Sequence, residues 1–164
     1  DMLTIREKHG RLTGLKLAYI GDANNVCASL AHACVKCGIT MTVASPQGYE
    51  MSDAFLKSLN PSDLVTQLRD PAEAVRDADV IYTDVWTSMG QEEEYEKRRK
   101  DFQGYQVNAE LIEKAPKAII MHCLPAHRGE EISDQAVDCP RSVVFDQAEN
   151  RLHVQRALFC RLLG

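Results

Sequence analysis

The chain has 164 residues, 45% of them hydrophobic and 26% charged, and its formal net charge is −5. This length and composition are typical of one globular domain with a buried core, and they exclude a disordered chain. Acidic and basic residues are interspersed, which argues against a nucleic-acid partner, because such a partner requires a basic face. No apolar run approaches the ~20 residues of a membrane-spanning helix, so no membrane association is expected.

Short apolar runs alternate with helical patterns along the chain. The runs predict strands at 15–22, 40–46, 63–68, 79–85 and 117–124, with a short sixth strand at 142–146. Helical patterns occupy 3–10, 24–38, 50–59, 70–78, 92–102, 108–115, 130–137 and 149–163. The helix at 70–78 has a clear start, with Asp70 as N-cap, Pro71 at the first helical position and Glu73 at the third.

This alternation predicts βαβ units, a parallel sheet and right-handed crossovers. We therefore expect one α/β domain with a doubly wound, Rossmann-like parallel sheet of about five strands flanked by helices. In such sheets ligands bind beyond the carboxyl ends of the strands, where the strand order reverses. If the order is 3-2-1-4-5, the loops after the first, fourth and fifth strands share one rim, and a small-molecule site belongs there.

The six cysteines do not indicate disulfides. Cys27, Cys34, Cys37 and Cys160 lie in apolar, helix-like stretches, where free cysteine packs as a small hydrophobe. The first ten residues, DMLTIREKHG, lack a secretory pattern. We expect a reducing, cytoplasmic setting, with the mitochondrial matrix as the alternative for a eukaryotic source.

The loop after the first strand, GDANN (21–25), is similar to a phosphate-binding turn but is not a dinucleotide fingerprint. Ala23 and Val26 stand where that fingerprint has glycine, and the second strand ends without an acidic residue for a ribose. We therefore expect no nicotinamide cofactor. Asn24 and Asn25 lie at a helix N-terminus, which favours either an anion such as a carboxylate or a plain N-cap.

The loop after the fourth strand, DVWTSMG (84–90), combines an acid, a hydroxyl and a glycine. Asp84 emerges from an apolar strand, so its carboxylate requires a partner, for which a cation is suited. Ser88 adds a hydrogen bond, and Gly90 lets the backbone approach a ligand. The alternative is an Asx-turn with no role in binding.

The third segment, MHCLPAHRG (121–129), follows the fifth strand and raises the question of a metal. Zinc requires three or four ligands at suitable spacing, and His122, Cys123 and His127 supply only some of them. On a strand, His122 and Cys123 point to opposite faces, so they cannot both face one ion without a bend. The C-x-x-C at 34–37 lies inside a predicted helix and has no second copy. We expect no metal.

Substrate positioning is the better interpretation of this segment. Pro125 fixes the backbone directly after Leu124, where the Leu124 carbonyl can face a ligand.

Together these segments resemble a known family. GDANNV, DVWTSMG and MHCLPAHRGEEI, followed by FDQAENRLHVQRAL, are similar to the ornithine-binding half of ornithine transcarbamylases (ornithine carbamoyltransferases), in order over essentially the whole chain. The resemblance implies transfer of the carbamoyl group of carbamoyl phosphate to the δ-amine of L-ornithine, giving citrulline and phosphate. This is the chemistry of arginine biosynthesis and the urea cycle, and it requires no cofactor.

The resemblance also implies roles for individual residues. Asn25 would bind the ornithine α-carboxylate, together with the backbone N–H of Met89. Asp84 and Ser88 would bind its α-ammonium.

The remaining roles concern the reacting groups. Cys123 would lie beside the reacting amine and, with Asp84, act in catalysis. Cys123, the Leu124 carbonyl and Arg151 would contact carbamoyl phosphate. His122, with Pro125, would orient the segment.

The family's preceding carbamoyl-phosphate domain has no counterpart here, because its Ser-Thr-Arg-Thr-Arg loop does not occur in the sequence. We therefore expect residues 1–164 to be a C-terminal ornithine-binding domain, inactive alone, whose parent is a homotrimer formed through the absent domain. Two alternatives stay open: a transcarbamylase for another amine such as putrescine, and a non-catalytic α/β ligand-binding module. Asn25 favours an amino acid over putrescine, which has no carboxylate.

Overall fold

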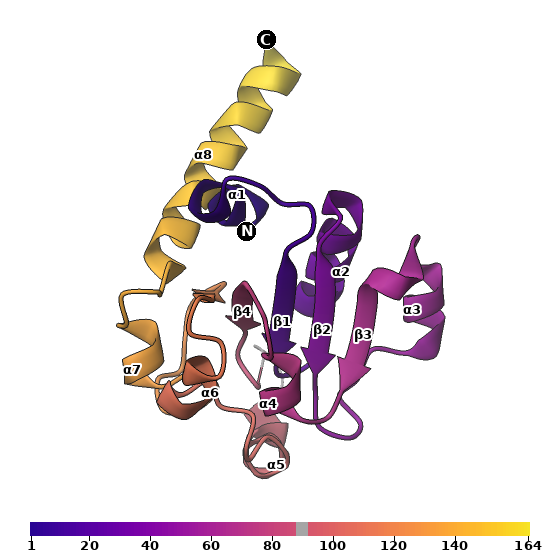
Figure 1. Cartoon of the computed structure of the whole chain (residues 1–164), viewed down its shortest axis with the longest axis vertical. Coiled ribbons are helices and arrows are strands. Elements are labelled where there is room, and N and C mark those ends of the chain that lie inside the picture. Colours follow the sequence, from indigo (N-terminus) through magenta and orange to yellow (C-terminus); the bar gives the residue numbers. More distant parts are fainter. Residues whose placement is uncertain (88–91) are drawn as a thin grey trace.

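A computed structural model describes residues 1–87 and 92–164 of the chain. Its centre is a parallel sheet of five strands in the order β3-β2-β1-β4-β5, the order on which the expectation of one shared rim depended (Figure 1). The strands are β1 Lys16–Ile20, β2 Thr40–Ala44, β3 Val65–Leu68, β4 Val80–Thr83 and β5 Ile119–His122. Each is shorter than its apolar run, because the run continues into the loops at the sheet's edges.

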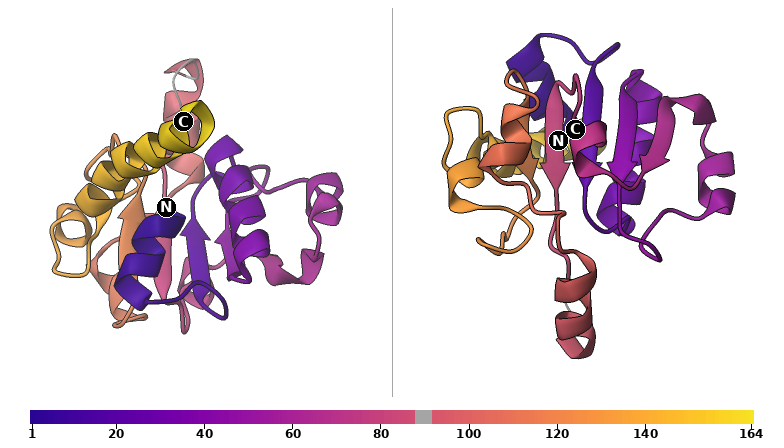
Figure 2. Two further views of the ribbon diagram at one scale, coloured as in Figure 1. Left: turned by 90° about the horizontal axis from the view of Figure 1, so that it is seen from above. Right: turned by 60° about the horizontal axis from the view of Figure 1, so that its bottom comes forward.

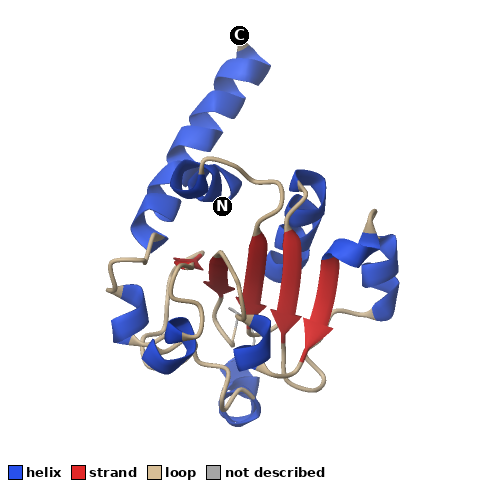
Figure 3. Cartoon of the chain, in the orientation of Figure 1, coloured by secondary structure: helices blue, strands red, loops and turns tan. Residues whose placement is uncertain are grey.

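Helices connect the strands and lie on both sides of the sheet (Figure 3). They are α1 Met2–His9, α2 Asn25–Cys37, α3 Asp53–Ser58, α4 Pro71–Ala74, α5 Tyr95–Asp101, α6 Ala109–Glu113, α7 Asp134–Val137 and α8 Val144–Leu163, with 3-10 turns η1 Ser62–Leu64 and η2 Glu92–Glu94. The predicted start of α4 is confirmed, since the Asp70 side chain accepts a hydrogen bond from the Ala72 N–H at 2.8 Å.

Each face of the sheet has its own hydrophobic core. On β1, Leu17 and Tyr19 pack with buried residues of α1 and α2, whereas Ala18 and Ile20 pack with those of α4, α6 and α7. Successive side chains of a strand point to opposite faces, so a strand buried on both sides is apolar throughout. The sheet is therefore doubly wound, as predicted.

The predicted sixth strand at 142–146 is wrong. Ser142 forms only an isolated parallel bridge with Ile120, and α8 begins at Val144, five residues before the predicted helix. Val144 is buried in the core beside α4, α6 and α7. This segment is apolar because α8 begins inside the protein, not because it forms a strand.

The predicted helix at 130–137 is reduced to the single turn α7. Glu131 and Ile132 precede this turn in a loop and are completely buried there. Ser133 caps α7 by accepting a hydrogen bond from the Ala136 N–H.

Two helices extend beyond the sheet. Helix α5 stands out past the carboxyl ends of the strands (Figure 2), and the C-terminal half of α8 extends away from the sheet (Figure 1). Every residue of α8 from position 151 onward is exposed. These include large apolar side chains, namely Leu152, Val154, Leu158, Phe159, Leu162 and Leu163. In the part of the chain that the structure describes, no helix is long and apolar enough to cross a membrane.

Candidate active site

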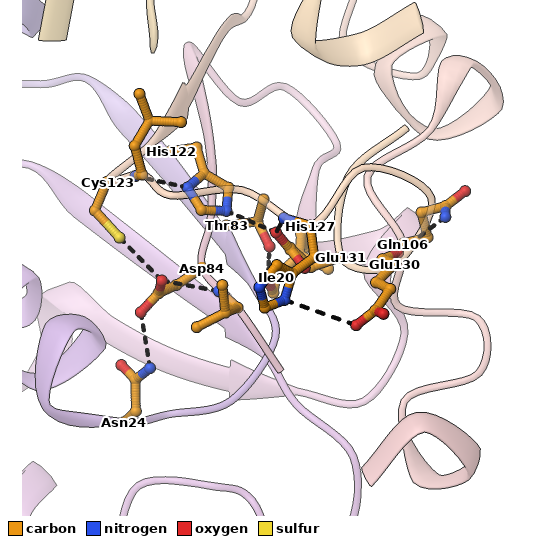
Figure 4. Close-up of polar contacts among 12 residues, drawn as sticks. Ile20, Asn24, Thr83, Asp84, Gln106, His122, Cys123, His127, Glu130 and Glu131 are labelled. Atoms are coloured by element: carbon orange, nitrogen blue, oxygen red, sulfur yellow. Dashed lines mark hydrogen bonds and ion pairs between the residues drawn. The ribbon is translucent and has the colours of Figure 1, made fainter. Parts of the chain in front are cut away.

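The loops that follow β1, β4 and β5 meet at the carboxyl ends of three adjacent strands. Asn24 comes from the first loop, Asp84 from the second and Cys123 from the third, and Figure 4 shows the three side chains pointing toward one another. The sequence predicted this convergence from the strand order. The predicted residues Ser88 and Met89 lie outside the described residues.

Asp84 contacts both other members of this cluster and is only 5% exposed. Its Oδ1 accepts hydrogen bonds from the Cys123 thiol at 2.9 Å and from the Val85 N–H at 2.8 Å. Its Oδ2 accepts from the Asn24 amide at 2.9 Å. In the described structure its partners are thus neutral donors rather than a cation. A buried carboxylate whose described partners are all neutral donors is suited to pair with an incoming ammonium group.

The two asparagines divide the roles that the sequence left open. Asn24 is the N-cap of α2, since its Oδ1 accepts hydrogen bonds from the N–H groups of Val26 and Cys27 at 2.9 and 3.1 Å. Asn25 is exposed and lines the cavity beside this cluster. Capping therefore belongs to Asn24, and the side chain of Asn25 faces the cavity at the positive end of the helix.

Cys123 is a hydrogen-bond donor rather than a thiolate. Burial, with the adjoining Asp84 carboxylate, raises the pKa of the Cys123 thiol from 9.0 to about 12. At neutral pH the sulfur therefore keeps its proton and donates a hydrogen bond to Asp84.

His122 holds the backbone of the same segment. Its Nδ1 accepts the Leu124 N–H at 2.8 Å, and its Nε2 lies 3.0 Å from Oε1 of the buried Glu131. The ring is therefore assigned as the Nε2–H tautomer, with the Glu131 carboxylate as acceptor. Leu124 has φ 55°, a left-handed conformation that branched residues rarely adopt, and its peptide bond to Pro125 is cis. The hydrogen bond from Leu124 to His122 stabilises this backbone.

The bend that would bring His122 and Cys123 to one side is present. Donor atoms of Asp84, His122 and Cys123 all lie within 4.8 Å of one another. His122 is the last residue of β5, so the alternation of strand side chains ends before Cys123. The chain turns there instead of continuing as a strand.

A cavity of about 570 Å³ adjoins the cluster and contacts four of the predicted site residues: Asn25, Cys123, Leu124 and Arg151. Arg151 reaches it from the exposed part of α8. The cavity thus combines a helix N-terminus and a guanidinium, which attract anions, with the carbonyl of Leu124 and the thiol of Cys123.

Two residues of the site were missed in the sequence, although both lie in the quoted motifs. Glu131 anchors His122, and Gln147 accepts the His122 N–H at 3.0 Å and donates to the Tyr82 hydroxyl at 3.1 Å. Each directly precedes an apolar residue in the sequence, Ile132 and Ala148 respectively. A polar residue beside an apolar one was the only local sign that these side chains are buried.

Arg98 was also missed, because the sequence at 92–102 shows only a charged helix. Its Nη1 donates to Asp22 Oδ2 at 2.7 Å and to the Trp86 carbonyl at 2.9 Å, and its Nε donates to Glu94 at 3.0 Å. Arg98 is 7% exposed, and burial raises the pKa of the Asp22 carboxyl despite this pairing. The guanidinium therefore ties the loop after β4 to the loop after β1.

The arrangement corresponds to known proteins. Residues 13–162 match the sequence model of the family described as aspartate/ornithine carbamoyltransferase, Asp/Orn binding domain. The chain belongs to this carbamoyltransferase family. Ornithine carbamoyltransferase from Thermococcus kodakarensis is 54% identical over 100% of the chain, and that from Bacillus subtilis is 53% identical over 99%.

Solved carbamoyltransferases have the same fold. The structure of ornithine carbamoyltransferase from Pyrococcus furiosus is 51% identical, covers 97% of the chain and superposes with a TM-score of 0.90. That from Thermus thermophilus is 47% identical, covers 100% and has a TM-score of 0.88. The chain spans about half the length of the relatives it matches, namely 54% and 53% of the two curated ones and 53% of each solved chain.

Proposed function

We propose that the chain is the ornithine-binding half of an ornithine carbamoyltransferase, which transfers the carbamoyl group of carbamoyl phosphate to the δ-amine of L-ornithine. The observation that carries this proposal is the Asp84 carboxylate, buried among neutral donors and hydrogen-bonded to Cys123. An amino-acid substrate supplies the cation that this carboxylate does not have among the described side chains. The proposal also covers Ser88 and Met89 as ornithine ligands, and it includes no cofactor and no metal in the reaction.

The cavity supports a zwitterionic ligand with a second ammonium. Asn25, which lines the cavity at the N-terminus of α2, suits the α-carboxylate. Asp84 is not among the lining residues but is hydrogen-bonded to the cavity-lining Cys123, and its carboxylate suits the α-ammonium. Putrescine has no carboxylate for Asn25, so ornithine is the better substrate.

Carbamoyl transfer requires the reacting nitrogen to lose two protons. The δ-ammonium first loses one to bulk water, because only the neutral amine attacks the carbamoyl carbon. The C–N bond then forms as the C–O bond to phosphate breaks, the phosphate leaves with the electron pair, and the nitrogen's second proton passes to it. Cys123, as a neutral thiol on Asp84, orients the amine, and the Leu124 carbonyl accepts from the carbamoyl NH₂.

Arg151 supports the second substrate. It lines the cavity from α8, where its guanidinium suits the phosphate group of carbamoyl phosphate. His122 and Pro125 orient the Leu124 backbone for the same contact.

A second domain completes the proposed enzyme. The relatives are about twice as long as the chain, and the exposed apolar side chains of α8 are suited to packing against another part of a longer protein. We propose that residues 1–164 form the C-terminal domain, that a carbamoyl-phosphate domain precedes it, and that the parent is a cytoplasmic homotrimer assembled through that domain, without a nucleic-acid partner. The 164-residue chain alone is then expected to form no citrulline at a measurable rate.

The first test is a titration of the purified chain with L-ornithine and, separately, with putrescine. The readouts are thermal stability and the fluorescence of Trp86, the chain's one tryptophan. A ligand of the folded state raises its stability by mass action. Ornithine should raise the Tm of the wild type but not of Asp84→Asn, and an equal or larger response to putrescine would contradict the assignment.

The second test uses the full-length enzyme and measures citrulline. Asp84→Asn should reduce kcat/KM for ornithine by at least a hundredfold. Unchanged turnover in this variant, or turnover by the isolated chain, would overturn the proposal. A non-catalytic binding module would instead bind ornithine without any citrulline formation in the full-length protein.

A further inference from the structure

The loop between β5 and α7 brings together three side chains that the proposed reaction does not use as ligands. Its turn is closed by hydrogen bonds from the Glu130 N–H to the His127 carbonyl at 3.0 Å and from the Gly129 N–H to the Ile132 carbonyl at 2.8 Å. Donor atoms of His127, Glu130 and Glu131 consequently lie within 4.8 Å of one another. Figure 4 shows the His127 ring facing Glu130, with Nδ1 and Oε2 separated by 3.8 Å.

Glu131 gives an independent indication that this loop can bind a cation. Its side chain is fully buried, and its Oε1 accepts hydrogen bonds from His122 Nε2 and from the His127 N–H, at 3.0 and 2.6 Å. Its Oε2 has no hydrogen-bond partner among the residues that the structure describes. A buried carboxylate oxygen without a partner is energetically unfavourable and rare in native proteins.

We propose that His127, Glu130 and Glu131 form a binding site for a divalent transition-metal ion of the Zn²⁺ type. One imidazole and two carboxylates are a common ligand set for such ions, and a fourth position stays open for water. A ligand set that contains an imidazole is unsuited to Mg²⁺ and Ca²⁺, because these ions prefer oxygen ligands.

The geometry requires only small adjustments for binding. Ligands about 2.0–2.2 Å from a tetrahedral ion lie roughly 3.5 Å apart, so the 3.8 Å pair needs little movement. The side chain of His127 is 49% exposed and that of Glu130 is 24% exposed, so both can rotate, whereas the buried Glu131 is fixed. The site also adjoins the active-site cluster, because the Glu131 carboxylate is shared with His122.

Cobalt binding to the purified chain tests this site, since Co²⁺ replaces Zn²⁺ and reports its ligands by absorption. All proteins carry Cys123→Ser, because Asp84, His122 and Cys123 form a second group of donors within 4.8 Å of one another. The test variants are His127→Ala and Glu130→Gln. The matched control is His153→Ala, which removes the histidine of an exposed His–Glu pair on α8 with a separation of 3.5 Å.

We expect one Co²⁺ per chain in the parent and the His153→Ala control, with visible bands but no near-ultraviolet thiolate-to-cobalt band. Each test variant should bind at least tenfold more weakly while keeping the parent's metal-free Tm. No saturable binding, a thiolate band on the bound cobalt, or a loss confined to one test variant would overturn the three-ligand site. These outcomes do not depend on ornithine, so they are separable from the failure of the proposed carbamoyl transfer.

Discussion

The Cys123 thiol donates a hydrogen bond across 2.9 Å to Oδ1 of Asp84, so the carboxylate at the centre of the site holds the thiol in its neutral form. The contact joins the ends of β5 and β4, which are neighbours in the sheet. A thiol held in this way differs from the thiolate of a cysteine nucleophile, which requires a positive neighbour to lower its pKa.

Replacing Asp84 by Asn should make Cys123 more reactive. Burial and the Asp84 charge together raise the pKa of Cys123 to about 12, and Asn removes the charge. Because the thiolate fraction rises as the pKa falls, we expect alkylation of Cys123 by iodoacetamide at pH 8 to be faster in the variant than in the wild type. Mass spectrometry can follow Cys123 against the exposed Cys160 in the same sample. An unchanged ratio of the two rates would show that Asp84 does not control the thiol.

Stability should decline above pH 9. The folded chain raises the pKa of both Cys34 and Cys123 from 9.0 to about 12, chiefly by burial. Between these values the unfolded state binds fewer protons than the folded state, so the free energy of unfolding falls as pH rises. The slope is about 1.4 kcal/mol per pH unit for each such thiol. Urea denaturation at pH 8, 9 and 10 measures it, and Cys34→Ala should make the decline shallower. Equal slopes in the two proteins would contradict the assignment to Cys34.

Glu131 should be tolerant of Gln and intolerant of Ala. Gln keeps an oxygen that accepts from His122 Nε2 and the His127 N–H, whereas Ala leaves these buried donors without a partner. We expect Glu131→Ala to lower the free energy of unfolding by about 2–3 kcal/mol, and Glu131→Gln by less than half of that. Chemical denaturation of the two variants under identical conditions makes the comparison. Similar losses in both would mean that the carboxylate charge, not the acceptor oxygen, holds His122.

Arg98 should matter for stability through its buried partners. Removing it leaves Asp22 without its cation and the Trp86 carbonyl without its donor, and breaking such a buried pair typically costs about 3–5 kcal/mol. Arg98→Met should therefore be strongly destabilising, and adding Asp22→Asn should restore part of the loss. Arg99, the adjacent exposed position, provides the control Arg99→Met, which should change the free energy of unfolding very little. A double variant no more stable than Arg98→Met would contradict the pairing.

The sequence predicted the parallel sheet because strands buried on both faces are apolar throughout, as at Tyr19 and Ile20. It also placed Asp84 and Cys123 on one rim, since adjacent parallel strands end together. It could not separate a buried helix start from a strand at Val144, because both are short apolar runs.

Contacts between distant residues were beyond sequence reasoning. Arg98 and Asp22 are 76 positions apart, and nothing near either residue indicates the other. His122 and Cys123 were assigned to opposite faces by strand alternation, which ends at His122, where β5 stops. Local patterns predict elements, whereas the partners of buried charges depend on how those elements pack.

Asn24 and Asn25 provide a matched pair that separates stability from binding. Asn24 caps α2 and donates to Asp84, so Asn24→Ala should lower the free energy of unfolding by about 1 kcal/mol or more. Asn25 is exposed at the cavity, so Asn25→Ala should leave the free energy of unfolding nearly unchanged and abolish the rise in Tm with L-ornithine. Urea denaturation and ornithine titration of both variants measure the two quantities. If Asn25→Ala keeps the full ornithine response, the α-carboxylate binds elsewhere, and Asn25 is only the first residue of the helix.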